Sequence, residues 1–195
     1  MTMLTRNRKI GLAVALTGFV ADQALKLLVT GPLGLANDND QIVLTSFFNL
    51  TRTSNYGVSL GLLKADSDLM RWLLVALTGG IALVVGAWLM REKKFGDILP
   101  LAMILGGALG NIVDRVRFGH VVDFADLHFG EWRPFLVFNL ADALISVGVV
   151  IILARSLLIR EKPNLETAGQ AFSSQLESTG DSENAPNHKM PAMEI

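Results

Sequence analysis

Four long apolar runs constrain this chain more than any other feature. A helix needs about 20 residues to cross the hydrocarbon core of a bilayer, and runs that meet or approach this length lie at 10–29, 72–90, 98–113 and 136–159. Of all residues, 51% are hydrophobic and only 18% are charged, a charged fraction that is low for a soluble domain. We therefore predict an α-helical membrane protein with four transmembrane helices. The first run is too long and too charged for a cleaved signal peptide.

Basic residues in the connecting segments predict how these helices are oriented. They gather before the first run, between the second and third, and after the fourth: Arg6, Arg8 and Lys9; Arg91, Lys93 and Lys94; Arg160 and Lys162. Segments rich in Lys and Arg tend to stay in the cytoplasm. Both termini are therefore expected to be cytoplasmic, with segments 30–71 and 114–135 on the outer side.

The outer segment 30–71 is too long to be a simple turn. Its stretches "QIVLTSFFNLTRT" and "YGVSLGLL" mix β-branched and aromatic residues with turn formers, which is typical of short strands. We predict a small β-rich cap here. Residues 163–195 are polar and without apolar periodicity, so we expect a disordered cytoplasmic tail after a membrane domain at 1–162.

Polar residues within the apolar runs gather near their outer ends. With a helical rise of 1.5 Å per residue, Asp142 is expected about 9 Å inside the fourth run and Asp22 about 10 Å inside the first. Asn111 and Asp114 close the third run on the same side, and Asn139 lies one turn from Asp142. Because a carboxylate within a membrane is costly, such residues indicate function. The sequence predicts a polar site just beneath the outer surface.

Other polar and small residues have simpler interpretations. Lys26 follows Asp22 by four residues, so the two can pair on one helix face in a structural or orienting role. Gly106 and Gly110 form a GxxxG pattern, which is typical of close helix packing. Four outer-loop residues are interpreted as solvated surface or headgroup contacts rather than ligands: Arg117, His120, Asp126 and His128.

Several chemistries are excluded by what the sequence lacks. There is no cysteine, so the chain has no disulfide, thiol nucleophile or cysteine metal site. The three histidines are not at HExxH spacing, and no glycine-rich phosphate loop is present. The net charge of −1 gives no reason to expect nucleic acid as a partner. We expect no metal and no cofactor.

A pair of carboxylates remains as the simplest reactive group. Two aspartates held close together share one proton, so one can accept a proton from water while the other polarises a carbonyl. Asp142 is the natural first member, and four residues are candidate partners: Asp22, Asp114, Asp123 and Asp126. Buried carboxylates are also the kind of residue that a small proton- or ion-conducting membrane protein would use. A non-catalytic membrane scaffold is the third alternative.

Four stretches together resemble the lipoprotein signal peptidase family, also called signal peptidase II. They are "GNIVDRVRFGHVVDFAD" (110–126), "FNLADALIS" (138–146), "ADQALK" (21–26) and "FFNLTRTSNYG" (47–57). Their order and spacing agree with that family over residues 10–160. The chain departs from the family pattern at Leu60, where an aromatic residue is usual a few positions after the cap glycine.

The resemblance implies an aspartic endopeptidase of the bacterial inner membrane with its active site at the periplasmic face. Its substrates would be diacylglyceryl-modified prolipoproteins, cut just before the lipidated cysteine, and membrane lipids would surround it. The family's catalytic pair corresponds to Asp123 and Asp142. The other family positions imply supporting roles: Asn111, Arg115 and Asn139 lining the site, Asn55 and Gly57 in the cap over it, and Asp22 and Lys26 as a structural pair.

Overall fold

The computed structural model of the chain describes residues 4–57 and 68–158. The predicted tail, the departure at Leu60 and most of the strand predicted in "YGVSLGLL" lie outside the described residues. Four helices and three strands make up the described part: α1 (Arg6–Thr30), β1 (Gln41–Val43), β2 (Phe48–Asn55), α2 (Asp68–Arg91), α3 (Phe95–Phe118), β3 (Val121–Leu127) and α4 (Leu140–Leu158). All four helices are long and apolar enough to cross a membrane, which confirms the predicted fold class.

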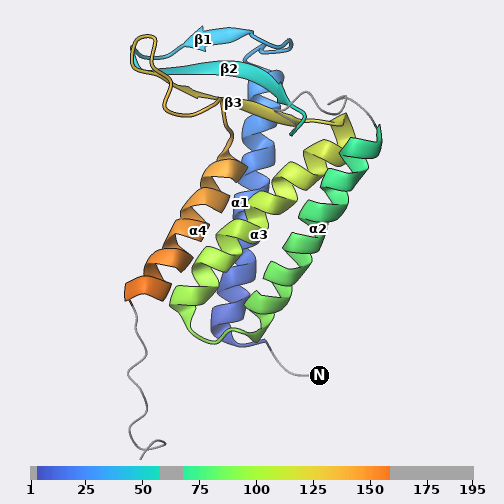
Figure 1. Cartoon of the computed structure of the whole chain (residues 1–195), viewed down its shortest axis with the longest axis vertical. Helices are drawn as coiled ribbons and strands as arrows, with labels where there is room; N and C mark the ends of the chain where they lie inside the picture. Colours follow the sequence, from blue (N-terminus) through green and yellow to red (C-terminus); the bar gives the residue numbers. More distant parts are fainter. Residues whose placement is uncertain (1–3, 58–67, 159–195) are drawn as a thin grey trace, which may run out of the picture. The chain divides into compact units, whose positions relative to one another are not determined.

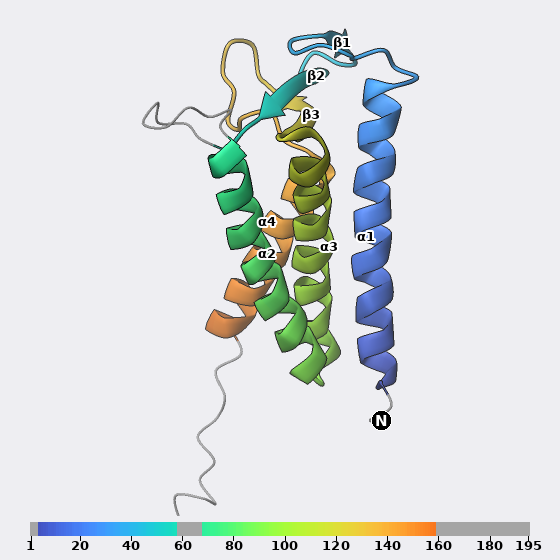
Figure 2. The ribbon, with the colours of Figure 1, turned by 90° about the vertical axis from the view of Figure 1, so that its right-hand side faces the viewer.

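The helices run alternately up and down, with the sheet at one end, here called the sheet end (Figure 1). Helix α3 packs against both α1 and α2, and Figure 2 shows it between them. Half of its most apolar 18-residue window is buried, a larger share than in any other of the four helices. Helix α3 is therefore the centre of the bundle, while the other three present mostly apolar faces outward, as a bilayer requires.

Glycines allow α1 and α4 to approach α3 closely. A Cβ on Gly106 would lie 2.5 Å from the carbonyl oxygen of Ala15 in α1. A Cβ on Gly107 would clash with the carbonyl oxygen of Ala141 in α4, and one on Gly110 with the carboxylate of Asp22. The GxxxG prediction of close packing is thus confirmed. The same closeness brings the polar ends of α1, α3 and α4 together.

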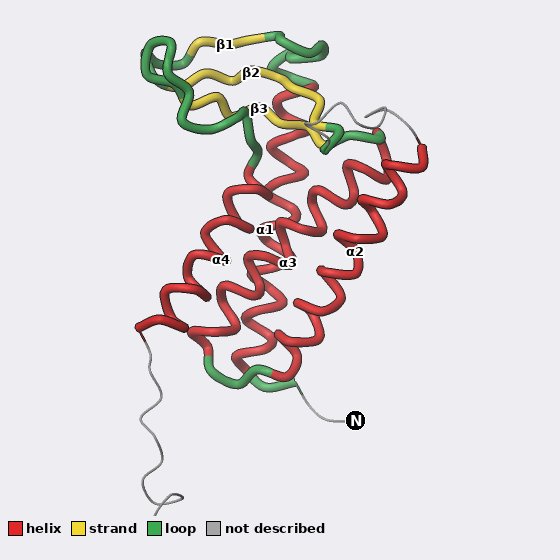
Figure 3. Tube along the Cα trace, in the orientation of Figure 1, coloured by secondary structure: helices red, strands yellow, loops and turns green. Residues whose placement is uncertain are grey.

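The three strands form one antiparallel sheet in the order β1-β2-β3, which lies across the sheet end of the helices (Figure 3). Short strands were predicted in segment 30–71, and β1 and β2 confirm this. The third strand, β3, was not predicted, and it comes from segment 114–135. Every residue of β3 except Leu127 is buried. A strand buried on both faces shows no polar–apolar alternation, so the usual strand signal is absent there.

Helix α4 begins at Leu140, four residues later than the predicted span 136–159. Phe138 pairs in both directions with the backbone of Ala125 in β3, so this apolar residue belongs to the cap and not to the helix. The predicted depth of Asp142, about two turns inside the span, is therefore wrong. Asp142 lies in the first turn of α4, directly beneath the sheet.

The opposite end of the bundle is held by contacts between helix ends. Arg8 in α1 donates to the carbonyl oxygens of Glu92 and Arg91, and Asn7 donates to that of Lys93. Arg155 in α4 pairs with Asp97 in α3 at 2.8 Å. The helix ends are thus fixed on both sides of the apolar core.

Candidate active site

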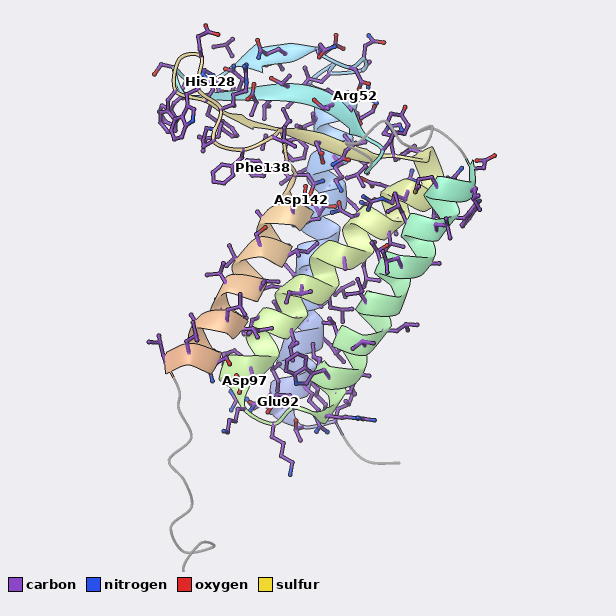
Figure 4. The ribbon with its side chains drawn as sticks, viewed as in Figure 1. Arg52, Glu92, Asp97, His128, Phe138 and Asp142 are labelled. Carbon is purple, nitrogen blue, oxygen red and sulfur yellow. The ribbon has the colours of Figure 1, made fainter. Side chains whose placement is uncertain are left out.

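The first turn of α4 is built around Asn139 and Asp142. The Asn139 side-chain oxygen accepts from the backbone N–H of Asp142 at 2.9 Å, and the Asp142 carboxylate accepts from the backbone N–H of Asn139 at 3.3 Å. This reciprocal arrangement is a capping box. It directs the Asp142 carboxylate back toward the sheet (Figure 4). Negative charge at this position is stabilised by the positive end of the helix dipole.

Asp123 lies in β3 and is 1% exposed. Its two carboxylate oxygens accept hydrogen bonds from two amides, Asn139 Nδ2 at 2.6 Å and Asn55 Nδ2 at 2.9 Å. Asn139 therefore contacts both aspartates: its side-chain amide binds Asp123, and its backbone N–H binds Asp142. The two carboxylates that the family resemblance selects are brought together by a single residue.

Gly57 fixes which atom of Asn55 faces Asp123. The backbone N–H of Gly57 donates to Asn55 Oδ1 at 2.8 Å, so the other amide atom, Nδ2, is the one that reaches the aspartate. Gly57 has a φ of 78°, a conformation that favours glycine. The cap thus supplies one oriented donor to the site.

Asn111 connects Asp142 to a buried lysine. Its Nδ2 donates to Asp142 at 2.8 Å, while its Oδ1 accepts from Lys26 Nζ and from Asn139 Nδ2, each at 3.2 Å. An ammonium group can only donate, so Lys26 determines the orientation of this amide. The oriented amide then presents a donor to Asp142.

Lys26 is 5% exposed and has three acceptors for its three protons. They are Asn111 and the carboxylates of Asp22 and Asp114, each carboxylate at 2.8 Å. The predicted ion pair between Asp22 and Lys26 is confirmed. Asp114 is a second anionic partner of Lys26, which the sequence did not predict. Asp22 also accepts from the backbone N–H of Ala141 at 3.0 Å, which ties this network to the first turn of α4.

The structure separates the four carboxylates that sequence reasoning left open. Asp22 and Asp114 are occupied by Lys26. Asp126 bonds to Thr51 at 3.1 Å and to Arg133 at 3.2 Å. Its interpretation as solvated surface is wrong, because it is only 2% exposed and β2 covers it. Asp123 is the one that shares Asn139 with Asp142.

Two further residues belong to this end of the molecule. Arg115 is half-buried on α3, and a Cβ on Gly57 would lie 3.5 Å from its Nη2, so its guanidinium lies under the cap. Gln23, which the sequence analysis did not single out, donates to Asp114 at 2.9 Å and to the carbonyl oxygen of Gly110 at 3.2 Å. A polar residue next to Asp22 within an apolar run was the feature of the sequence that could have indicated its part in this polar network.

Burial and the neighbouring charge of Asp142 raise the pKa of Asp123 to about 7, against the lowering effect of the hydrogen bonds from Asn55 and Asn139. Desolvation disfavours the charged form of a carboxyl, and a second carboxylate does the same. The protonated form of Asp123 is therefore favoured compared with that of an ordinary aspartate. Asn139 lies between this carboxyl group and that of Asp142.

Buried polar side chains of the described residues are all at the sheet end of the molecule. They are Asp22, Lys26, Asn49, Asn111, Asp114, Asp123, Asp126 and Asn139. The prediction that polar groups gather at one end of the spans is confirmed.

Comparison with known proteins agrees with this architecture. The family model described as signal peptidase (SPase) II matches residues 14–158. The lipoprotein signal peptidase of Sphingopyxis alaskensis is 55% identical over 163 residues, covering 84% of this chain and 91% of that protein. The lipoprotein signal peptidase of Rhizorhabdus wittichii is 50% identical over 155 residues, covering 80% and 90%.

Solved structures give the same result for the fold. A bacterial membrane enzyme determined by the in meso method at 1.9 Å resolution superposes with a TM-score of 0.66 at 25% identity, covering 79% of this chain and 95% of that one. Fold and buried polar site thus place the chain in the class of helical membrane enzymes. The chain belongs to the signal peptidase II family, and the family predicted from the motifs is confirmed.

Proposed function

We propose that this protein is an aspartic endopeptidase that removes signal peptides from diacylglyceryl-modified prolipoproteins, with Asp123 and Asp142 as its catalytic pair. Membership of the signal peptidase II family supports the reaction. The observation that carries the assignment of the pair is the position of Asn139, which bonds to both carboxylates.

The chemistry follows from the different surroundings of the two aspartates. Asp142, in the first turn of α4, takes a proton from water as the oxygen attacks the scissile carbonyl carbon. Protonated Asp123 gives its proton to the carbonyl oxygen, so no unpaired negative charge develops there. The tetrahedral intermediate then collapses: the C–N bond breaks, the leaving amine takes the proton from Asp142, and Asp123 regains its own. Asn55, Asn111 and Asn139 hold both carboxylates in position, and Arg115 under the cap supplies positive charge near them.

A groove on the surface of α4 supports a substrate that arrives from within the bilayer. It has a volume of about 230 Å³ and is lined by Phe135, Phe138, Asp142, Ala143 and Ser146. Its walls are apolar except at Asp142 and Ser146, so an acyl-bearing substrate can approach sideways with its peptide bond at the aspartate. The reaction then takes place in the bacterial inner membrane, with the sheet end at the periplasmic face and both termini in the cytoplasm.

The test is cleavage of a purified prolipoprotein by the full-length protein in detergent. Substrate with and without its diacylglyceryl group is given to the wild type and to Asp123→Asn and Asp142→Asn. Asp126→Asn is the matched control, because it is another buried aspartate of β3 with partners outside the pair.

We expect the wild type and Asp126→Asn to cleave only the lipidated substrate, and the other two variants to lose cleavage by at least about 10³-fold while still folded. Normal turnover by folded Asp123→Asn or Asp142→Asn would refute the catalytic pair. Absence of cleavage by folded wild type would refute the reaction.

A further inference from the structure

A second cavity lies between the sheet ends of α1 and α3, behind the network of Lys26. It has a volume of about 140 Å³. Its walls come from α1 (Gln23, Lys26, Leu27 and Thr30), from α3 (Asp114, Arg117 and Phe118), and from the cap (Arg52, His120 and Val122). Neither Asp123 nor Asp142 lines it, so it is distinct from the proposed catalytic pair.

Basic groups dominate this cavity. Lys26, Arg52 and Arg117 contribute three positive charges to the lining and Asp114 one negative charge. Outside the lining, Asp22 pairs with Lys26 and Asp38 pairs with Arg52. Both oxygens of Asp114 are already engaged, by Gln23 on one side and by Lys26 and the backbone N–H of Val122 on the other. The Lys26 ammonium is likewise satisfied. Arg52 uses only Nη1 in its ion pair with Asp38, and Arg117 has no ion pair among the described residues, so donors of these two side chains are available to a ligand.

Two nitrogens in this wall have no hydrogen-bond partner among the described residues. They are Nε of Arg52 and Nε2 of His120, both shielded from solvent. Arg52 has only 15% of its side chain exposed, and its ion pair with Asp38 uses Nη1 at 3.2 Å. A buried donor without a partner is costly. The Nε–H of Arg52 is such a donor, and an acceptor with several oxygens would satisfy it. Nε2 of neutral His120 carries a lone pair, because the other ring nitrogen donates to the backbone of Phe118, and it becomes a donor only when the imidazole is protonated.

The surroundings of the cavity indicate where such an acceptor comes from. Leu27 and Phe118, which line it, are 57% and 49% exposed. Along the same side of α1, Leu16 and Val20 are 62% and 53% exposed, and their spacing to Leu27 places all three on one face. A basic recess thus opens at the end of an apolar helix face that lies against lipid tails. This is the arrangement of a phospholipid, with its phosphate above its acyl chains.

We propose that the recess between the sheet ends of α1 and α3 binds the phosphate group of an anionic phospholipid of the surrounding bilayer. Arg52 and Arg117 donate to the phosphate oxygens from opposite sides, as guanidinium groups do, and His120 closes the recess. The acyl chains lie along the exposed face of α1. This inference depends on the membrane location of the chain and not on its catalytic activity.

The first experiment measures lipid binding by native mass spectrometry of the full-length protein in detergent. The protein is titrated with phosphatidylglycerol, with diacylglycerol carrying the same acyl chains, and with inorganic phosphate. We expect phosphatidylglycerol to bind and diacylglycerol to fail, because only the former carries the phosphate. Binding of inorganic phosphate without the lipid would overturn the assignment to a phospholipid, and equal binding of diacylglycerol would overturn the phosphate site.

Arginine variants then locate the binding site. Arg52→Gln and Arg117→Gln should each weaken phosphatidylglycerol binding by about tenfold or more, the usual effect of losing a charge-assisted hydrogen bond. Arg133→Gln is the matched control, since Arg133 is a cap arginine in an ion pair with Asp126, and it does not line the cavity. Equal weakening in all three variants would mean general attraction to anionic lipid and would overturn the site.

A measurement on the wild type avoids any question of misfolded variants. Burial and the positive charge of Arg52 lower the pKa of His120, with Asp38 and Asp114 acting in the opposite direction. A phosphate held by Arg52 would offset that positive charge, so phosphatidylglycerol should raise the pKa of His120, as followed by NMR of the imidazole. His128, which does not line the recess, serves as the internal reference. An unchanged His120 titration at saturating lipid would contradict the proposal.

Discussion

At the scale of single residues, Asn139 contacts both aspartates and caps the N-terminus of α4. It caps α4 through its oxygen, donates its amide to Asp123 and binds Asp142 through its backbone N–H. It is fully buried, and both polar atoms of its side chain are used. Helix capping and positioning of the two carboxylates are therefore performed by the same residue.

These two roles of Asn139 are separable by substitution. Asn139→Ser retains an oxygen that can cap the helix but lacks the amide that reaches Asp123, whereas Asn139→Ala loses both. The serine variant should be more stable than the alanine variant by about 1 kcal/mol. Both should lose cleavage rate to a similar extent, by about 10²-fold, the effect of a misplaced catalytic group. Thermal unfolding and initial rates in detergent measure the two quantities, and wild-type rates for Asn139→Ser would contradict the positioning role.

The pKa of Asp123 makes a prediction about pH. The reaction needs one proton on the pair, and burial together with Asp142 raises the pKa of Asp123 to about 7. Raising the pH above this value removes the proton that polarises the carbonyl, so kcat/KM should fall about tenfold per pH unit. The observed pKa belongs to the coupled pair. Initial rates between pH 6 and 9 test this, with substrate binding to Asp142→Asn as the control, and a flat profile would be inconsistent with the proposal.

At the scale of secondary-structure elements, glycines decide how closely the helices approach. Gly107 faces the carbonyl oxygen of Ala141, at the start of α4, whereas Gly79 in α2 has nothing within 4 Å of an added Cβ. Gly107→Ala should destabilise the protein and displace the first turn of α4, which carries Asp142. Gly79→Ala should be neutral or stabilising by about 0.5–1 kcal/mol, since alanine is the better helix former.

Thermal unfolding and cleavage rates of both glycine variants test this difference. We expect Gly107→Ala to lose both stability and activity, and Gly79→Ala to retain both. Equal stability of the two variants would mean that the α3–α4 contact is looser than the structure indicates.

The elements also show which parts of the fold the sequence could predict. In lipid, the backbone groups of a spanning segment must form hydrogen bonds within that segment, so a long apolar run becomes a helix. The four spans therefore follow from the length and position of the apolar runs. The boundary of α4 does not, because Phe138 is apolar in either position, and only its pairing with Ala125 assigns it to the cap. Likewise, nothing local distinguishes the buried strand β3 from a helix segment.

At the scale of the whole molecule, the site joins residues that are far apart in the chain. The sequence predicted that five polar residues lie near one end of the spans, because each falls close to the outer end of an apolar run: Asp22, Asn111, Asp114, Asn139 and Asp142. It could not predict which carboxylate faces which, because that depends on how the helices are rotated and on a strand outside them. Only the family motif selected Asp123 from four candidates, and Asn139 now gives that choice a geometric reason.

Lys26 connects three helices. Its ammonium binds Asp22 on its own helix and Asp114 and Asn111 on α3. Asp22 in turn accepts a hydrogen bond from the backbone at the start of α4. Lys26→Met leaves two buried carboxylates without their cation, so it should cost about 3–5 kcal/mol of unfolding free energy. Adding Asp114→Asn to Lys26→Met removes one of those charges and should restore part of the loss.

The matched control is Arg52→Gln, whose ion pair with Asp38 is partly exposed and contributes about 1 kcal/mol or less. Thermal unfolding in detergent measures all of these variants. A double variant no more stable than Lys26→Met alone would show that the lysine acts by packing, whereas partial recovery would show that its charge is what joins α1, α3 and α4.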